Sequence, residues 1–501
     1  MSDDVTGVPD DWRETLEDLA ERRRHATSMG GEQRLAKRAA EGRLNARQRV
    51  AALLDDGTFR EFGRLVGDDV PSDAFVAGSG LIDGRPVMLG AEDFTTLAGT
   101  IGGGSNAKRY RLAELALNER VPLIMLLDGA GFRPGSRSHG RSPTDLLAQA
   151  RCSGNVPIIT GVMGASAGHG ALIAPISNFV VMTEDSSIFT AGPPVVKQST
   201  GEDVHKLDLG GPSVAIPSGL VHNLAANDQD ALEQIRRYLS YFPSSAWSYP
   251  MHRPTDDGYR STPELLSIIP RNNRQVYDMR RAIEVIVDDH QWWEVQAGYG
   301  EAIVCALAHL GGESVAIVAN QPQVLAGSID ADAASKAARF ITIADSFHLP
   351  IVFLSDNPGV LPGTVSEREG ILRAGARMFA AQSLATTVKL HVTFRKAYGF
   401  GSMVMGMVSF DRQTGSYAFP GATLGAMGAD ASSNASKADD EVRAELRRLE
   451  LQASYNSASN LGFDELIDPR ETRDVLLDGL NLAMHRRQAV PEPVARVGIT
   501  P

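Results

Sequence analysis

The sequence predicts an α/β protein that consists of two similar domains in tandem. The first observation is an internal repeat, because residues 95–136 resemble residues 323–364. Asp128 and Asp356 stand at matching positions of the two copies, 228 residues apart, and the other matches keep the same offset. A constant offset over a whole supersecondary unit indicates duplication rather than two unrelated α/β segments.

The second observation is the order of elements inside each copy. The short apolar runs "PVMLGAEDF" and "VAIVANQP" predict strands, and "AKRYRLAELALNE" has apolar residues at helical spacing. The near-continuous apolar runs "VPLIMLLD" and "LPIVFLSD" are typical of buried parallel strands. Each ends in Asp before a Gly/Pro loop, the place where open α/β sheets bind ligands. A third strand follows in each half, "VPIITGVMG" and "VKLHVTFR".

A segment rich in Pro, Ser and Tyr, "YFPSSAWSYPMHRPTDDGYRSTPE", marks the break between the halves. We therefore expect a helical arm over residues 1–60, a first domain over 61–250 and a second domain over 251–501.

Composition limits the classes of function. The net charge of −12 argues against nucleic acid or an anionic membrane as the main partner. Two cysteines, Cys152 and Cys305, allow neither a disulfide framework nor an all-cysteine zinc site, and we expect both to be small core residues and no metal site. No signal peptide and no apolar run of membrane-spanning length is found, so a cytoplasmic location is expected.

Two stretches that follow the third strands carry the candidate chemistry, "MGASAGHGAL" and "RKAYGFGSMVM". A strand that turns into a helix leaves free main-chain N–H groups at the helix start. Two such donors aimed at one point make an oxyanion hole. We predict Gly168 with His169 as one pair of donors and Phe400 with Gly401 as the other. The alternative is a pair of tight turns that only pack helix against strand.

No clear side-chain base accompanies these turns. His169 is a candidate acid or base, but the interpretation that we favour gives the chemistry to its main-chain N–H and makes its ring a pocket wall. Asp128 and Asp356 are expected to order loops. "IGGGSNAK" lacks the ending of a nucleotide-binding P-loop and is either a phosphate or adenine loop, with Lys108 and Arg109 nearby, or a simple turn. The absence of a base suggests a reaction in which the cofactor or substrate handles the proton.

Several motifs together carry a family resemblance: "EGRLNARQRVAALLDDGTFREF", "GPPVVKQSTGEDVHKLDLGG", "DNPGVLPGT", "RKAYG" and "FDELIDPRETR". With them the chain resembles, over nearly its whole length, the carboxyltransferase (β) subunits of biotin-dependent acyl-CoA carboxylases of the propionyl- and methylcrotonyl-CoA type. The resemblance implies two tandem crotonase-like (ββα-superhelix) domains, the first on the acyl-CoA side and the second on the biotin side.

The resemblance also implies an enzyme, a ligase or transferase, that moves the carboxyl group from carboxybiotin to the α (or vinylogous γ) carbon of an acyl-CoA, with biotin N1 as the base. The Gly168 and His169 amides would then hold the thioester oxygen, and the Phe400 and Gly401 amides the biotin ureido oxygen. The residues expected to bind biotin are Tyr398, Gly399, Phe400 and Gly401, and those expected to bind the acyl-CoA are Gly103, Gly104, Lys108, Arg109, Ala130, Gly131, Ala167 and Met403.

The partners that the resemblance implies are a biotin carboxylase/biotin carboxyl carrier α subunit and further β subunits in a hexamer, in fatty acid metabolism. Two alternatives stay open: a non-catalytic structural β paralogue in a mixed complex, and the carboxyltransferase subunit of a biotin-dependent decarboxylase. The chain departs from its relatives at His169, at Met403 and in the loop at 129–143, so its acyl group is left open.

Overall fold

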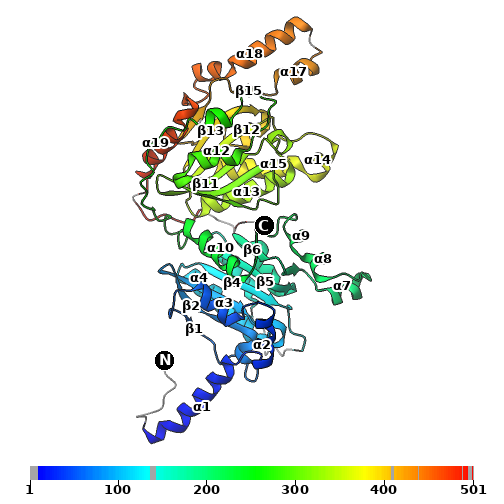
Figure 1. The fold of residues 1–501 in the computed structure, drawn as a ribbon, viewed down its shortest axis with the longest axis vertical. Coiled ribbons are helices and arrows are strands. Elements are labelled where there is room, and N and C mark those ends of the chain that lie inside the picture. Colours follow the sequence, from blue (N-terminus) through cyan, green and yellow to red (C-terminus); the bar gives the residue numbers. More distant parts are fainter. Residues whose placement is uncertain are drawn as a thin grey trace. The chain divides into compact units, whose positions relative to one another are not determined.

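The computed structural model describes residues 9–135, 143–407, 411–437, 439–487, 489–494 and 499 of the 501-residue chain. It contains two compact units, Met1–Ser240 and Tyr241–Pro501 (Figure 1). The predicted domain limit at residue 250 stays a prediction. Residues 136–142 of the divergent loop at 129–143 lie outside the described residues.

The first unit is built on a mixed sheet with the strand order β1-β2-β3-β4-β5-β6-β8, with β7 paired to β5. β2 is antiparallel to β1 and β3, whereas β3 through β6 and β8 are parallel. The strands are β1 (Arg60–Glu61), β2 (Phe75–Ile82), β3 (Arg85–Glu92), β4 (Leu123–Gly129), β5 (Ile158–Ala167), β6 (Phe179–Thr183), β7 (Ser187–Phe189) and β8 (Asn223–Ala225).

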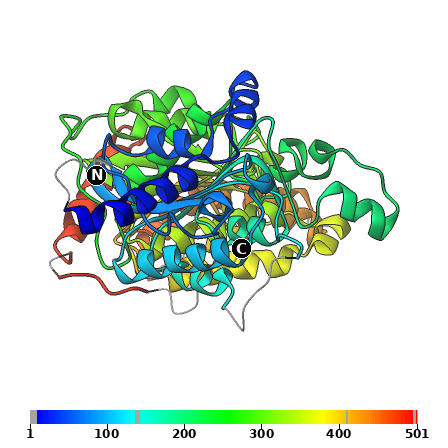
Figure 2. The ribbon, with the colours of Figure 1, turned by 90° about the horizontal axis from the view of Figure 1, so that it is seen from below.

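Helices cover both faces of this sheet. Apolar residues of α4 and α5 join one face in a shared core, whereas α3 and α10 pack on the other side, where Ile235 lies against Gly161. α7 and α8 project away from the sheet in both ribbon views (Figures 1 and 2). The helices are α1 (Asp10–Thr27), α2 (Glu32–Ala40), α3 (Ala46–Leu53), α4 (Gly103–Asn118), α5 (Asp145–Cys152), α6 (Ile173–Ile176), α7 (Pro193–Thr200), α8 (Lys206–Gly210), α9 (Pro212–Ala215) and α10 (Asp228–Tyr241).

The second unit repeats this sheet with the order β16-β14-β13-β12-β11-β10-β9 and β15 paired to β13. Its antiparallel and parallel pairings match those of the first sheet strand for strand. The strands are β9 (Trp292–Val295), β10 (Ile303–Leu310), β11 (Glu313–Asn320), β12 (Ile351–Asn357), β13 (Lys389–Tyr398), β14 (Gly415–Ala418), β15 (Thr423–Gly425) and β16 (Glu465–Leu466).

Here α12 and α19 share a core with one face of the sheet, and α13, beside α15, packs on the other. Alternate residues of β10 supply the two faces, so every residue of the strand except the half-buried His309 is buried, as expected for a sheet covered on both sides. The helices are α11 (Leu265–Ile268), α12 (Met279–Ile286), α13 (Ala331–Ser346), α14 (Thr364–Glu369), α15 (Ile371–Leu384), α16 (Gly399–Val404), α17 (Ala429–Ala435), α18 (Asp440–Ser459) and α19 (Thr472–Met484).

The α/β duplication predicted from the sequence is confirmed, and it extends to unusual backbone. The turn at Leu97–Gly99 is left-handed, with φ of 46° and 53° at Leu97 and Ala98, and Leu325–Gly327 repeats it with 48° and 55°. Such angles are unfavourable for non-glycine residues. Their recurrence in both halves shows that the fold, rather than a local accident, imposes this turn.

A buried arginine fixes the N-terminal helices to the first sheet. Arg49 of α3 donates to the Asp128 and Asp228 carboxylates, at 2.9 Å each, and to the carbonyl of Met163 at 2.6 Å. Arg38 of α2 also pairs with Asp128. Because Asp128 is at the end of β4, these pairs order the loop that follows, which agrees with the role expected for Asp128.

We predict that Arg49→Met lowers the free energy of unfolding by about 3–5 kcal/mol, because it leaves Asp228 buried without its main countercharge. The measurement is urea denaturation followed by circular dichroism at fixed protein concentration. Arg22→Met is the matched control, since Arg22 forms an exposed pair with Asp18 whose loss should leave the midpoint nearly unchanged. Equal midpoints for the two variants would contradict this account of Arg49.

Candidate active site

The first predicted oxyanion turn lies where β5 ends. Ala167 closes the strand, and residues 168–172 form a short 3₁₀ helix. The main-chain N–H groups of Gly168 and His169 come first in this helix, so no intrahelical carbonyl can accept from them. Both residues are half-buried. The carbonyl of Ala167 lies so close to Gly131 that a Cβ there would come within 2.8 Å of it, which brings the loop after β4 against this turn.

The second turn lies at the end of β13, where Tyr398 precedes α16. Gly399 has a φ of +54°, and Gly168 has +53°, so these two glycines are equivalent. The predicted pairs are therefore offset by one position, because the first begins at the equivalent glycine and the second begins one residue later. His169 and Phe400 are the equivalent residues that both pairs contain. Gly401 is buried, and Phe400 is half-buried.

The His169 ring is part of a buried chain of polar contacts. Its Nε2 atom makes a short hydrogen bond to Asp145 Oδ1, and 25% of the His169 side chain is exposed against 0% of the Asp145 side chain. Arg109 Nε donates to Asp145 Oδ2 at 2.6 Å, and Arg109 Nη1 donates to Glu92 Oε1 at 2.7 Å. Gln149 adds a further donor to Asp145 at 3.0 Å.

The same chain of contacts also holds the main chain next to the first turn. Glu92 Oε2 accepts from the main-chain N–H of Asp128 at 2.8 Å, and a Cβ on Gly170 would come within 2.9 Å of Glu92 Oε1. Burial, opposed in part by Arg109, raises the pKa of Glu92. Burial alone would raise the pKa of Asp145 too, but the His169 hydrogen bond and the Arg109 charge lower it to about 2. Asp145 is thus an anion throughout the physiological range.

The second half holds no such chain at the corresponding positions. Asn320 replaces Glu92 and accepts from the main-chain N–H of Asp356 at 3.1 Å, and Ala337 occupies the position of Arg109. Phe400 replaces His169, and its ring packs on Gly375 and Phe379 of α15. The Phe400 side chain therefore anchors its turn to α15 rather than only lining a pocket.

The Gly-rich loop at the start of α4 already holds a carboxylate. Asp73 accepts from the main-chain N–H of Ser105 and pairs with Arg133, and it lies next to Gly104. A phosphate at Gly103 and Gly104 would face this buried anion. The geometry therefore does not favour the phosphate role that the sequence suggested for this loop.

Lys108 and Arg109, predicted to bind substrate, are both buried. Lys108 Nζ donates to the carbonyls of Ser72 and Phe75, and burial lowers its pKa to about 8. Lys336, its equivalent in the second half, likewise donates to the carbonyl of Gln296. This repeated contact gives the lysine a structural task in both halves and leaves its charge inaccessible to a phosphate.

The remaining predicted residues are close to one of the two turns. Ala130 is exposed, Gly131 is buried beside Ala167, and Met403 is 45% exposed on α16. The Tyr398 hydroxyl donates to Glu450 of α18, and burial together with this hydrogen bond raises the pKa of Tyr398. Both expected core cysteines are buried, as predicted.

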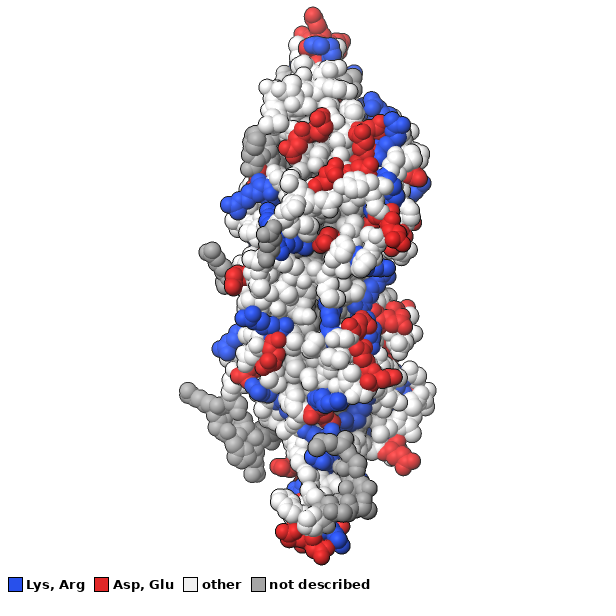
Figure 3. Space-filling model, turned by 90° about the vertical axis from the view of Figure 1, so that its left-hand side faces the viewer, with Lys and Arg blue, Asp and Glu red and all other residues white. Residues whose placement is uncertain are grey.

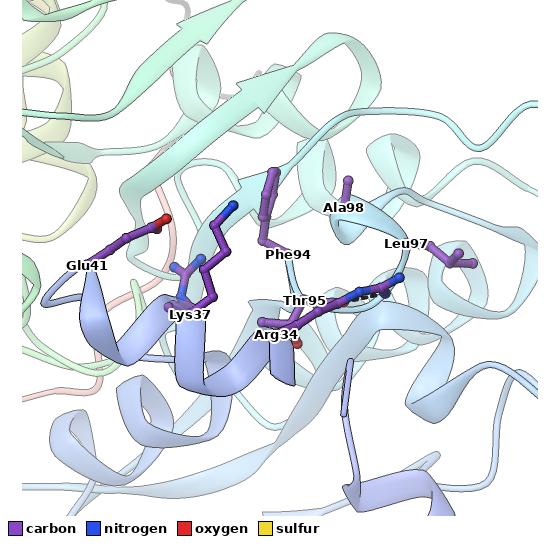
Figure 4. A pocket seen from close by; sticks show the side chains of 8 residues that line it. Arg34, Lys37, Glu41, Phe94, Thr95, Leu97 and Ala98 are labelled. Atoms are coloured by element: carbon purple, nitrogen blue, oxygen red, sulfur yellow. Dashed lines mark hydrogen bonds between the residues drawn. The ribbon is translucent and has the colours of Figure 1, made fainter. Parts of the chain in front are cut away.

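A basic cavity of about 510 Å³ opens beside the left-handed turn of the first unit. Its walls combine cations with apolar surface, and Figure 4 shows the Lys37 side chain extending from α2 toward Phe94. Arg34 donates to the carbonyl of Thr95 at 3.0 Å. Ala98 lines the cavity, and its carbonyl accepts from the main-chain N–H of Ala130 at 2.9 Å, so this part of the wall adjoins the loop next to Gly131. The lining residues are Arg34, Lys37, Arg38, Glu41, Phe94, Thr95, Leu97 and Ala98.

Sequence reasoning missed Asp145, Glu92 and this cavity. Asp145 follows a loop that reads as irregular, so nothing in its spacing connects it to His169. Glu92 could have been found, because a carboxylate inside an otherwise apolar strand must have a buried partner. The cavity joins Lys37 to Phe94, which are distant in the sequence.

The described residues offer neither a metal site nor a membrane-spanning helix. Within the described residues, no group of three His, Cys, Asp or Glu side chains is arranged to hold a metal ion, and none of the helices there is long and apolar enough to cross a membrane. Figure 3 shows Lys and Arg side chains interspersed with Asp and Glu on the face in view.

Comparison with solved structures supports the same architecture. The structure matches that of transcarboxylase 12S, crystallised as a hexamer with methylmalonyl-coenzyme A and methylmalonic acid bound, with a TM-score of 0.90 and 33% identity over 97% of this chain and 99% of that one.

Comparison of the sequence gives the same result. The chain is 36% identical to the carboxyltransferase subunit of propionyl-CoA carboxylase from Haloferax mediterranei, over 95% of this chain and 97% of that protein. It is 37% identical to the methylmalonyl-CoA carboxyltransferase 12S subunit of Propionibacterium freudenreichii, over 95% of each chain. It is 36% identical to the methylmalonyl-CoA decarboxylase subunit alpha of Veillonella parvula, over 95% and 97%. Residues 37–497 match the carboxyl transferase domain model, and the chain belongs to the carboxyl transferase family.

Proposed function

We propose that this chain is the carboxyltransferase subunit of a biotin-dependent acyl-CoA carboxylase. The observation that carries the proposal is the duplicated turn at Gly168 and Gly399, which presents first-turn N–H groups from two matched sites. One site suits the acyl-CoA and the other suits biotin, because both reactants develop negative charge on a carbonyl oxygen during the transfer.

In this proposal the main chain stabilises two oxyanions. Carboxybiotin, delivered by a partner subunit, supplies the carbon dioxide and the base that takes the proton from the acyl-CoA. The N–H groups of Gly168 and His169 hold the thioester oxygen as it gains charge, which eases loss of the α-proton. The N–H groups of Phe400 and Gly401 hold the ureido oxygen. The half-buried turns limit the access of water to both oxygens.

The basic cavity supports an acyl-CoA as the substrate of the first turn. Lys37 and Arg34 suit the phosphates of the CoA nucleotide, and Phe94 with Leu97 suits its adenine ring. From there the cavity wall at Ala98 continues to Ala130 and Gly131, and Gly131 adjoins the carbonyl of Ala167. A pantetheine arm laid along these residues would bring the thioester to Gly168.

Self-association fits the exposed apolar residues of α14 and α15. Val365, Leu372 and Leu384 are 64%, 71% and 73% exposed. Such surface favours an interface between subunits. We propose a hexamer, as in the transcarboxylase 12S structure, with biotin carried on a separate biotin carboxylase or carrier subunit.

Two other functions remain as candidates. A decarboxylase subunit would use the same site in reverse, and the Veillonella parvula relative favours it. A structural paralogue would keep the fold with little activity. The deciding experiment is carboxyl transfer from malonyl-CoA, methylmalonyl-CoA and methylglutaconyl-CoA to free biotin by the purified chain, followed by forward carboxylation in the native complex. Absence of transfer in both assays would contradict catalysis by this chain.

We predict that Phe400→Pro lowers the rate of transfer to free biotin about 100- to 1,000-fold below that of Phe400→Ala, because proline has no N–H to donate. Position 400 lies in the first turn of α16, where the N–H has no intrahelical partner, so proline removes no hydrogen bond of the helix itself. Both variants lose the ring contact with Phe379, so the comparison isolates the main-chain donor. Equal rates for the two variants would exclude the Phe400 N–H from catalysis.

We predict that Lys37→Ala weakens binding of propionyl-CoA about fivefold, measured by calorimetry, because one phosphate contact is lost. Binding of propionyl-pantetheine, which has no nucleotide, should not change. Lys197→Ala is the control, since Lys197 is an exposed lysine on α7 paired with Asp203. An equal loss of affinity for both thioesters would place the nucleotide elsewhere.

A further inference from the structure

The polar chain from His169 to Glu92 is more than the fold requires. The second unit has the same strand order, the same left-handed turn and an equivalent left-handed glycine, yet it has Phe400, Ala337 and Asn320 at the corresponding positions. Burying an arginine and two carboxylates costs free energy that these neutral residues avoid. The second unit thus acts as an internal control, and the added cost in the first unit calls for a functional explanation.

The net charge of this buried chain of contacts depends on where one proton is held. Arg109 contributes one fixed positive charge, whereas Asp145 and Glu92 are two carboxyl groups, and all three are buried. With both carboxylates ionised, Arg109, Asp145 and Glu92 together carry one net negative charge, which is costly in a buried cluster. One further proton, held by His169 or by Glu92, makes the cluster neutral. His169 is the member with solvent access, and its Nε2 is in contact with the Asp145 carboxylate.

The ring of His169 is close to the main-chain N–H that we propose holds the thioester oxygen. Asp145 holds Nε2, so Nδ1 is the ring nitrogen left for another partner, and by covalent structure it is the one nearer the main chain of its own residue. That main chain carries the N–H predicted to hold the thioester oxygen. The backbone does not require histidine at position 169, because Gly168 supplies the left-handed φ and Gly170 is the position with no room for a Cβ. Another residue type could stand there without disturbing the turn.

We propose that His169 is a catalytic residue of the acyl-CoA site, whose imidazolium, held by Asp145, donates a hydrogen bond to the thioester oxygen as the enolate forms. Asp145, Arg109 and Glu92 are positioning residues that keep the ring in place and charged. The proton stays on the ring throughout, so the step adds a donor and requires no further reactant. This inference rests on the proposed function of the first turn.

The test uses His169→Phe, which copies the residue of the second turn, and His169→Gln, which can still donate to Asp145 but cannot become a cation. The first readout is the infrared carbonyl stretch of bound [1-¹³C]propionyl-CoA, which needs no biotin. We expect this stretch at higher wavenumber in both variants than in the unaltered chain, because a donor to the oxygen is lost. An unchanged stretch in both variants would overturn the proposal.

The second readout is transfer from methylmalonyl-CoA to free biotin. We expect kcat to fall about 10- to 100-fold in His169→Phe, with KM changed by less than about threefold, since the donor acts mainly on developing charge. An unchanged kcat would overturn the role of the ring. Absence of transfer by the unaltered chain with every carboxyl donor would instead contradict the proposed function, and the two failures are therefore distinct.

The third readout tests the positioning residues through the pH profile. Among the described residues, the charged groups linked to His169 are Asp145 on α5, Arg109 on α4 and Glu92 at the end of β3. A carboxylate beside an imidazole favours its protonated form, so in Asp145→Asn the loss of activity at high pH should move to lower pH. Gln149→Leu, which removes an uncharged neighbour of Asp145, should leave that limb in place. Equal profiles for Asp145→Asn and Gln149→Leu would assign Asp145 a structural role alone.

Discussion

The candidate site depends on how the chain leaves the central strands β5 and β13. At both exits a glycine adopts a left-handed conformation, and the backbone then enters a helix whose first N–H groups have no internal acceptor. The glycine two positions later has no room for a Cβ, because Glu92 of β3 fills the space beside Gly170, and Asn357 and Gly359 fill the space beside Gly401. Only the residue between these glycines is free to vary, and it is His169 in one half and Phe400 in the other.

The duplication separates what the fold needs from what a particular site needs. Three features recur in both halves and so belong to the architecture. They are the buried lysine of α4 and α13, the left-handed turn, and the polar side chain that accepts from the main chain near the end of β4 or β12. The ion-paired chain behind His169 occurs in the first half alone, among the residues described. A similar comparison explains why Phe400 can be apolar, because its ring packs against α15 and needs no polar partner.

Much of the fold followed from the sequence, because the apolar runs of β4 and β12 and the constant spacing of the repeat are local signals. The turns at Gly168 and Gly399 were also predictable, since Gly-X-Gly after a strand recurs at matched places of the repeat. The contacts of His169 could not be predicted, because the packing of α5 on α4 places Asp145 beside it and no sequence pattern connects the two residues. The burial of Lys108 could not be predicted either, because its acceptors are the main-chain carbonyls of Ser72 and Phe75, which every residue type has.

Membership of the carboxyl transferase family and the paired turns together lead to one central claim, that each turn holds a different oxyanion through main-chain N–H groups. The most direct measurement is a structure of the assembled protein with propionyl-CoA and biotin bound. The account predicts the thioester oxygen at roughly 2.7–3.1 Å from the nitrogens of Gly168 and His169, and the biotin ureido oxygen at a similar distance from the Phe400 nitrogen. A thioester oxygen held by other groups, with both turns unoccupied, would contradict it.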